Sequence, residues 1–146
     1  MLGVGIEVDL AVRDLAVALR DRPIDAHGGL EGRLFQIAVE LPARAGALAM
    51  LEEAAAAFFK KTRAQRFGVD LHLAGDVPIA RGLGSSVTAR LGCVAGLNAL
   101  AGSPLDRQGL LEVVAALEGH PDNAAPAVFG GFTAAGFVGS EVRCIR

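Results

Sequence analysis

The sequence is poor in large aromatic residues. Its 146 residues include no tryptophan or tyrosine, and aromatic residues make up only 5% of the chain. The core must therefore be built mostly from alanine, valine, leucine and the seven phenylalanines. A composition that is 52% hydrophobic and 21% charged is typical of a globular protein rather than a disordered one. The length favours a single domain, in which about 68–70% of the unfolded chain's surface is buried.

Several classes of protein are disfavoured by what else is scarce. The net charge is −2 and no lysine and arginine cluster is present, which argues against a nucleic-acid partner. Only two cysteines occur, Cys93 and Cys144, with no CxxC spacing, so we expect neither a disulfide framework nor a zinc site. The chain has no apolar run of membrane-spanning length and no leader pattern at its start. We therefore expect a cytoplasmic protein without membrane partners.

Hydrophobic patterning predicts an α+β domain with helices on one face of a mostly antiparallel or mixed sheet. Turn residues at Asp21–Gly32 separate the first two expected strands. The expected strands are Leu15–Leu19, Leu34–Leu41, Val69–Val77 and the segment GGFTAAGFV. The expected helices are Ala45–Arg66, the segment VTARLGCVAGLNALAG that ends near Gly102, and Leu105–Leu117.

The strongest local signal is the segment PIARGLGSS, Pro78–Ser86, between an expected strand and an expected helix. Gly82 and Gly84 allow the backbone to turn sharply and to approach a ligand closely. The free N–H groups that begin the next helix favour an anion, and Ser85 and Ser86 can cap the helix, donate to phosphate oxygens or bind Mg²⁺. Taken alone, a Gly-Ser pair before a helix is also a common loop with a cap. It is not a Walker A loop, because the lysine of GK[ST] is missing.

This segment resembles the PxxxGLGSS phosphate loop of the GHMP kinases. A second segment, LEGHPDNAAPAVFGGF at Leu117–Phe132, is similar to the EGHPDNVAPAxxGG segment of homoserine kinases. A third, LGVGIEV at Leu2–Val8, resembles the family's SANLGVGFDV, with Ile6 and Glu7 in place of phenylalanine and aspartate. The first two segments occur in the family's order and separation, which makes them stronger together than either is alone.

The resemblance implies a fold and a domain arrangement. Residues 1–146 would form the N-terminal, ATP-binding domain of a GHMP kinase, a two-layer sheet-and-helix domain that resembles the ribosomal protein S5 domain 2-like fold. Homoserine kinases run to about twice this length, so the C-terminal domain is expected to be lacking. An apolar face should then be exposed where that domain docks. This favours either self-association or a C-terminal-domain partner.

The resemblance also implies a reaction, in which the γ-phosphate of ATP passes to the hydroxyl of L-homoserine in threonine biosynthesis. The cofactors would be ATP and Mg²⁺, with Ser86 and Glu118 as metal ligands and, with Asn123, as catalytic residues. Without the resemblance, the sequence favours a Glu118 carboxylate that faces solvent at a helix end. The residues expected to bind ATP and its phosphates are Pro78, Arg81, Gly82, Leu83, Gly84, Ser85 and Ser86.

The expected substrate contacts are Glu7, His120, Asp122 and Asn123. Asn123 stands where many GHMP kinases carry a catalytic aspartate, so it would orient the hydroxyl or the γ-phosphate. Asp122 can equally be a turn-forming or capping residue. Two other functions stay open: a nucleotide-binding remnant that does not phosphorylate, and a GHMP kinase for another small alcohol.

Overall fold

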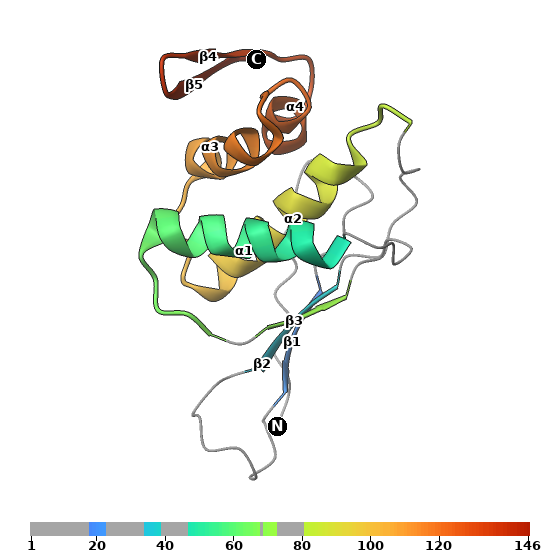
Figure 1. Cartoon of the computed structure of the whole chain (residues 1–146), viewed down its shortest axis with the longest axis vertical. Coiled ribbons are helices and arrows are strands. Elements are labelled where there is room, and N and C mark those ends of the chain that lie inside the picture. Colours follow the sequence, from blue (N-terminus) through green and yellow to red (C-terminus); the bar gives the residue numbers. More distant parts are fainter. Residues whose placement is uncertain (1–17, 23–33, 39–46, 68, 73–80) are drawn as a thin grey trace.

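The computed structural model of this chain describes residues 18–22, 34–38, 47–67, 69–72 and 81–146. Glu7 and Pro78 lie outside these residues. Within these residues, two strands are followed by a helix, a strand, three helices and a final hairpin (Figure 1). The arrangement is α+β, as the sequence predicts.

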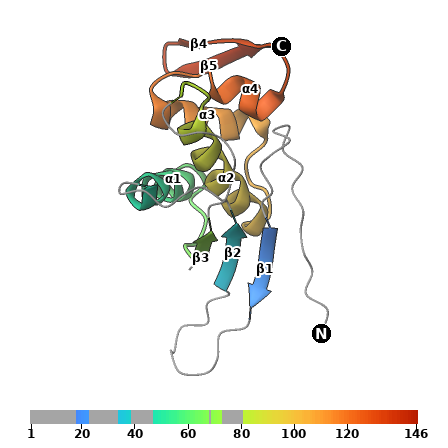
Figure 2. The same ribbon diagram turned by 90° about the vertical axis from the view of Figure 1, so that its right-hand side faces the viewer.

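Three strands form a mixed sheet in the order β1-β2-β3. Strand β1 (Ala18–Arg22) pairs antiparallel with β2 (Leu34–Ala38), and β2 pairs parallel with β3 (Val69–His72). A parallel pair needs a crossover connection, which here passes through the helix between β2 and β3. All the helices lie on the same side of this sheet (Figure 2).

The end of the first expected strand was placed too early, at Leu19. Strand β1 continues to Arg22, and Asp21 pairs with Phe35 of β2. The prediction that Asp21 opens a turn is therefore wrong. Aspartate is a poor strand former by propensity, but a residue in a strand is held by its ladder partner, which local sequence does not reveal.

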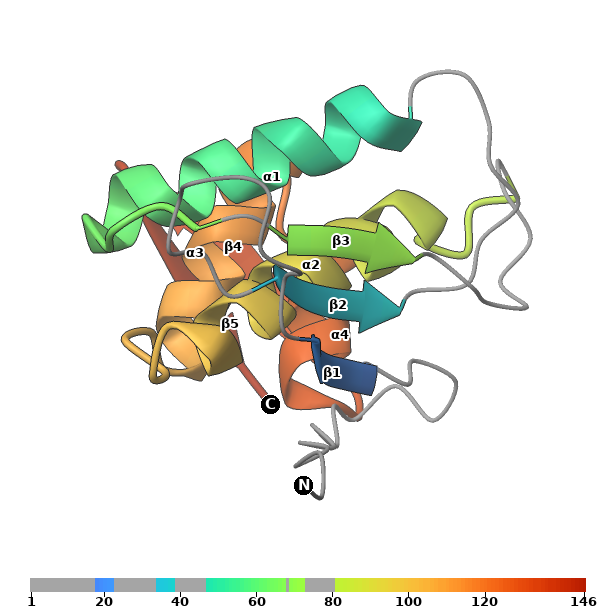
Figure 3. The ribbon, with the colours of Figure 1, turned by 90° about the horizontal axis from the view of Figure 1, so that it is seen from below.

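Helices α1 (Ala47–Thr62), α2 (Ser85–Leu100) and α3 (Arg107–Glu118) enclose the core. Helix α2 is central, and it contacts α1, α3 and strand β2 (Figure 3). Its residues from Leu91 to Asn98 are all buried, and several of them are small enough for neighbouring helices to approach closely. Phe58 of α1 fills part of this core and is fully buried, which contributes about 1.5–3 kcal/mol.

The turn between α2 and α3 holds the end of one helix against the start of the other. Asn98 Nδ2 donates to the carbonyl of Leu105, and the Leu105 N–H donates back to Asn98 Oδ1, both at 2.9 Å. Asp106 then caps α3 by accepting a bond of 2.8 Å from the Gly109 N–H. Gly119 ends α3 in the left-handed conformation. These contacts mark the start and the end of α3, whose last residue is Glu118.

The chain closes with helix α4 (Ala124–Phe129) and a hairpin of β4 (Ala134–Val138) and β5 (Glu141–Ile145). The hairpin packs on α3, at the end of the molecule opposite the three-stranded sheet (Figure 1). Strand β5 was not predicted, and its only buried residue is Val142. Within the described part of the chain, no helix combines the length and the apolar character that crossing a membrane requires.

Candidate functional site

The glycine-rich loop ends in a helix start that is open to a ligand. Gly84 caps α2 in the left-handed conformation, with φ of 73°, and no side chain caps the helix. Among the residues that the structure describes, no side chain accepts from the first-turn N–H groups of α2, which suits an anion. Ser85 and Ser86 are the first residues of α2, and neither acts as its cap. Arg81 and Leu83 are exposed on the loop.

A hydrogen bond joins the EGHPDN segment to the glycine-rich loop. Ser86 Oγ donates to Glu118 Oε2 at 3.1 Å, which joins the start of α2 to the end of α3. The side chain of Glu118 is only 9% exposed. The reading of Glu118 as a solvent-facing helix-end carboxylate is therefore wrong, because α3 ends against α2 rather than in water.

Arg90 is a site residue that the sequence reasoning missed. Its Nη1 pairs with Glu118 Oε1, and its Nη2 lies 3.6 Å from Glu53 Oε2 on α1. Arg90 is 15% exposed, and its buried Nε has no acceptor among the described residues. One signal could have identified it. It is the only charged residue in a helix of otherwise small, apolar and neutral polar residues, and it lies one turn after Ser86.

Asn123 also lies at the loop, on the side of the second motif. A Cβ built on Gly84 would be 3.6 Å from Asn123 Cβ and 3.9 Å from its Oδ1. Asn123 stands directly before α4 and makes no side-chain cap there. The Asn123 amide thus lies beside the glycine-rich loop and does not cap its own helix.

His120 and Asp122 form an exposed pair next to Asn123. His120 Nδ1 pairs with Asp122 Oδ1, which also accepts a bond of 3.0 Å from the Asn123 N–H. The hydrogen bond from His120, with that backbone bond, holds the pKa of Asp122 below its ordinary value of 3.8. Asp122 therefore stays ionised near neutral pH and orders the turn before α4.

The site offers a metal ion few protein ligands. Ser86 Oγ and Glu118 Oε2 are hard oxygen donors that converge, as two ligands of one Mg²⁺ would. No group of three or more histidine, cysteine, aspartate or glutamate side chains that could hold a metal occurs in the residues that the structure describes. The residues fit a Mg²⁺ ion whose remaining ligands are phosphate oxygens and water, which is its usual environment in phosphoryl transfer.

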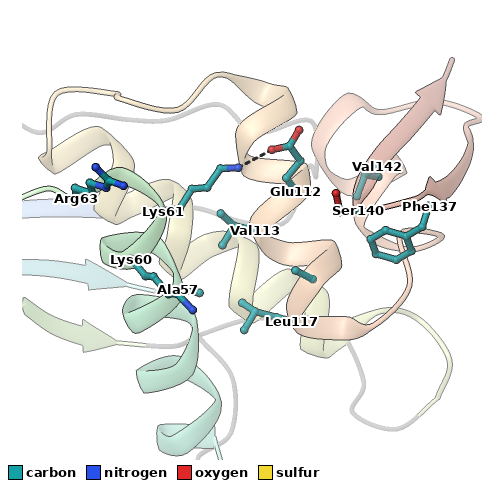
Figure 4. Close-up of a pocket in the computed structure, with 11 residues that line it drawn as sticks. Ala57, Lys60, Lys61, Arg63, Glu112, Val113, Leu117, Phe137, Ser140 and Val142 are labelled. Carbon is teal, nitrogen blue, oxygen red and sulfur yellow. Dashed lines mark hydrogen bonds and ion pairs between the residues drawn. The ribbon is translucent and has the colours of Figure 1, made fainter.

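A separate cavity of about 540 Å³ lies between α1, α3 and the hairpin (Figure 4). Lys61 lines it and pairs with Glu112 at 2.9 Å, while Val113, Phe137 and Val142 supply apolar walls. None of its lining residues belongs to the predicted phosphate or substrate set. Of the residues predicted from the motifs, Asn123 lies against Gly84 and Glu118 bonds to Ser86.

Comparison with known proteins decides the family. The model of the GHMP kinases N terminal domain matches residues 49–131, which include the loop, Arg90, Glu118 and Asn123. The chain belongs to the GHMP kinase family. The resemblance inferred from the motifs is thereby confirmed.

Two relatives of this GHMP kinase chain are homoserine kinases. A homoserine kinase of Moorella thermoacetica is 43% identical over 93 residues, which are 64% of this chain and 31% of the relative. A homoserine kinase of Synechococcus sp. strain CC9311 is 34% identical over 151 residues, which cover 98% of this chain and 47% of the relative. The chain thus spans about half the length of this relative.

A solved structure from Listeria monocytogenes, assigned provisionally as the homoserine kinase thrB, has a similar fold. It matches with a TM-score of 0.62 and 25% sequence identity. The match covers 90% of this GHMP kinase chain and 46% of that structure's chain.

Proposed function

We propose that the chain is the ATP-binding part of a homoserine kinase-like enzyme, which transfers the γ-phosphoryl group of ATP to the hydroxyl of L-homoserine in threonine biosynthesis. One observation carries the proposal. The glycine-rich loop and the EGHPDN segment, 32 residues apart at Ser86 and Glu118, meet through a hydrogen bond of 3.1 Å. The family match and the names of the relatives support the same reaction.

Phosphoryl transfer depends mainly on positioning and charge stabilisation. In the proposal, the backbone from Gly82 to Ser86 holds the phosphates, with Pro78 shaping the loop and Arg81 and Leu83 lying beside it. Mg²⁺, bound by Ser86 and one oxygen of Glu118, would neutralise charge on the phosphate oxygens. Asn123, a neutral amide, would orient the attacking hydroxyl rather than remove its proton.

The substrate would bind on the side of the second motif. His120 and Asp122 are exposed beside Asn123, where their polar atoms can contact an amino acid. Glu7, outside the described residues, is proposed to hold the substrate's amino group, because an ammonium ion requires a carboxylate or similar acceptor. The roles of His120 and Asp122 can be tested by substitution, since neither side chain is buried.

We further propose that residues 1–146 form one N-terminal domain with the S5 domain 2-like fold. A mixed sheet covered on one side by helices supports this assignment. The partner would be a small amino alcohol together with a C-terminal domain or a second copy of the chain, and neither nucleic acid nor a membrane. Two free cysteines fit the cytoplasm as the compartment.

Nucleotide titration tests the phosphate site. We expect ADP with Mg²⁺ to bind the chain in calorimetry, and Ser86→Ala to weaken binding at least about tenfold, the loss of one good phosphate contact. Ser140→Ala, in the exposed hairpin turn, is the matched control and should bind as the parent does. If both variants bound ADP equally well, the loop would have no part in the proposed function.

A coupled assay with homoserine, threonine, mevalonate and shikimate then tests the substrate. Phosphorylation of homoserine alone supports the proposal, and turnover of another alcohol would indicate a different GHMP kinase. A second candidate is nucleotide binding without phosphoryl transfer. It is favoured by the ion pair of Glu118 with Arg90, which already neutralises the carboxylate that would bind the metal. ADP binding without turnover, also when a C-terminal domain is added, would support that candidate.

A further inference from the structure

Both oxygens of the Glu118 carboxylate are already engaged. Oε2 accepts from Ser86 Oγ, and Oε1 is paired with the guanidinium of Arg90. The two charged side chains are 9% and 15% exposed, so water screens their attraction much less than it does for a surface pair. The positive charge beside Glu118, the proposed metal ligand, is therefore the guanidinium of Arg90.

Helix geometry explains why Arg90 is there. Residues four apart lie on one face of a helix, so Arg90 shares the face of Ser86, and α3 ends against that face. Its contact with Glu53 is weaker, at 3.6 Å, and Glu53 is mostly exposed. Glu118 is thus its principal partner, and a guanidinium orients a carboxylate more strictly than an ammonium does.

We infer that Arg90 is a positioning residue of this site, and that it also prevents a divalent metal from binding there before the nucleotide does. The inference rests on the proposed function, which makes Glu118 a Mg²⁺ ligand. Arg90 holds the Glu118 carboxylate so that only Oε2 faces Ser86. The positive charge of Arg90 then repels a second cation at Oε2.

The chemistry of the metal makes this order of binding reasonable. Mg²⁺ dehydrates reluctantly and is usually held by one or two carboxylates plus substrate phosphates. Here the carboxylate that bonds to Ser86 is that of Glu118, whose side chain is only 9% exposed, and Arg90 already neutralises it. The anionic phosphates of a nucleotide would supply the missing negative charge, so the metal and the nucleotide should enter together.

The test is a titration with Mn²⁺ alone, followed by electron paramagnetic resonance, since bound Mn²⁺ loses its free-ion signal. We expect the parent chain to bind Mn²⁺ weakly and Arg90→Gln to bind it at least about tenfold tighter, because the guanidinium no longer competes. Arg90→Lys keeps the charge and should remain weak. The double variant, Arg90→Gln with Glu118→Gln, should lose the gain in Mn²⁺ affinity. Arg143→Gln, a distant exposed arginine, is the control.

The Lys and Gln variants separate this role from a merely structural one. If Arg90 only supported packing, the two variants would bind Mn²⁺ alike, and the inference would be overturned. Arg90→Gln leaves a buried carboxylate unpaired and can unfold the chain. In that case added Mn²⁺ should restore helical circular dichroism by binding the folded form, and failure to restore it would count against the inference.

ADP binding is measured in parallel, so that the two proposals can fail separately. If ADP does not bind, the proposed function fails, while the Mn²⁺ affinities still decide the role of Arg90. If ADP binds and Arg90→Gln leaves the Mn²⁺ affinity unchanged, the proposed function stands and the inference falls. Tight Mn²⁺ binding by the parent chain without nucleotide would also overturn the inference about Arg90.

Discussion

The side chain of Asn123 lies directly against Gly84, the residue that caps helix α2. A Cβ at Gly84 would stand 3.6 Å from Asn123 Cβ, which is an ordinary van der Waals contact. The loop thus has room for a methyl group, but its backbone, with φ of 73°, strongly favours glycine. Conformation rather than space determines the residue at this position.

Gly84→Ala should therefore cost about 1–2 kcal/mol of unfolding free energy, the strain of a left-handed alanine. We also expect ADP affinity to fall about tenfold, because relief of that strain moves the N–H groups at the start of α2. Urea unfolding and calorimetry measure the two effects. Gly139→Ala is the matched control, since φ there is 64° and the space around it is open. It should lose similar stability and keep ADP binding, and an equal loss of binding in both variants would contradict the prediction.

Removing the carboxylate of Glu118 should destabilise the fold. Glu118→Ala leaves the guanidinium of Arg90 largely buried without its partner, which costs about 3 kcal/mol. Chemical denaturation measures the loss. The exposed pair of Lys61 and Glu112 is the comparison, where Lys61→Ala should cost less than about 1 kcal/mol. Equal costs would show that burial of the Arg90 pair contributes nothing.

The same Lys61 pair predicts a pH effect. A hydrogen bond from Lys61, and a second from Gln108, hold the pKa of Glu112 below its ordinary value of 4.5. Because the folded-state pKa is lowered, the stabilisation is complete above the unfolded pKa and is lost as the pH falls through the folded one. Lys61→Met should raise the pKa of Glu112 in a carbon-13 NMR titration. A pKa that does not move would contradict the pairing.

The two cysteines should differ in reactivity. Burial raises the pKa of Cys93 to about 12, and its thiol donates to the carbonyl of Leu51 at 3.8 Å. Thiolate is the reactive form, so Cys93 should stay unmodified at pH 8 in the native chain. Cys144 is only half-buried and should react with an aromatic disulfide reagent. Cys144→Ser should leave no fast-reacting thiol until the chain is denatured, and fast reaction of that variant would contradict the burial of Cys93.

The hairpin region should promote self-association. Phe132 is 93% exposed, Ile145 75% and Val138 63%, which leaves large apolar side chains in water. We expect sedimentation to show species larger than a monomer as the concentration rises. Replacing Val138 and Ile145 by threonine should shift the chain toward monomer, whereas replacing Glu141 and Arg143 should not. A monomer at every concentration would refute this prediction.

Local sequence was enough for the elements whose signals are local. The glycine and serine pattern before α2, the apolar stripe of α3 and the alternation near Val69 each identify an element from its own residues. The order and spacing of two motifs were also enough to predict the family, which the family model confirms. The end of β1 and the existence of β5 were missed, because strand limits depend on pairing partners elsewhere in the chain.

What tertiary structure decided was the electrostatic state of the site. The sequence by itself determined that Ser86, Glu118 and Asn123 are polar residues near helix ends, and spacing alone left Glu118 facing water. Only the packing of α3 against α2 shows that the Glu118 side chain is largely shielded from water and that Arg90 neutralises it. The physical reason is that a charge's environment depends on which distant segment covers it, and residues 28 positions apart have no local signal of their contact.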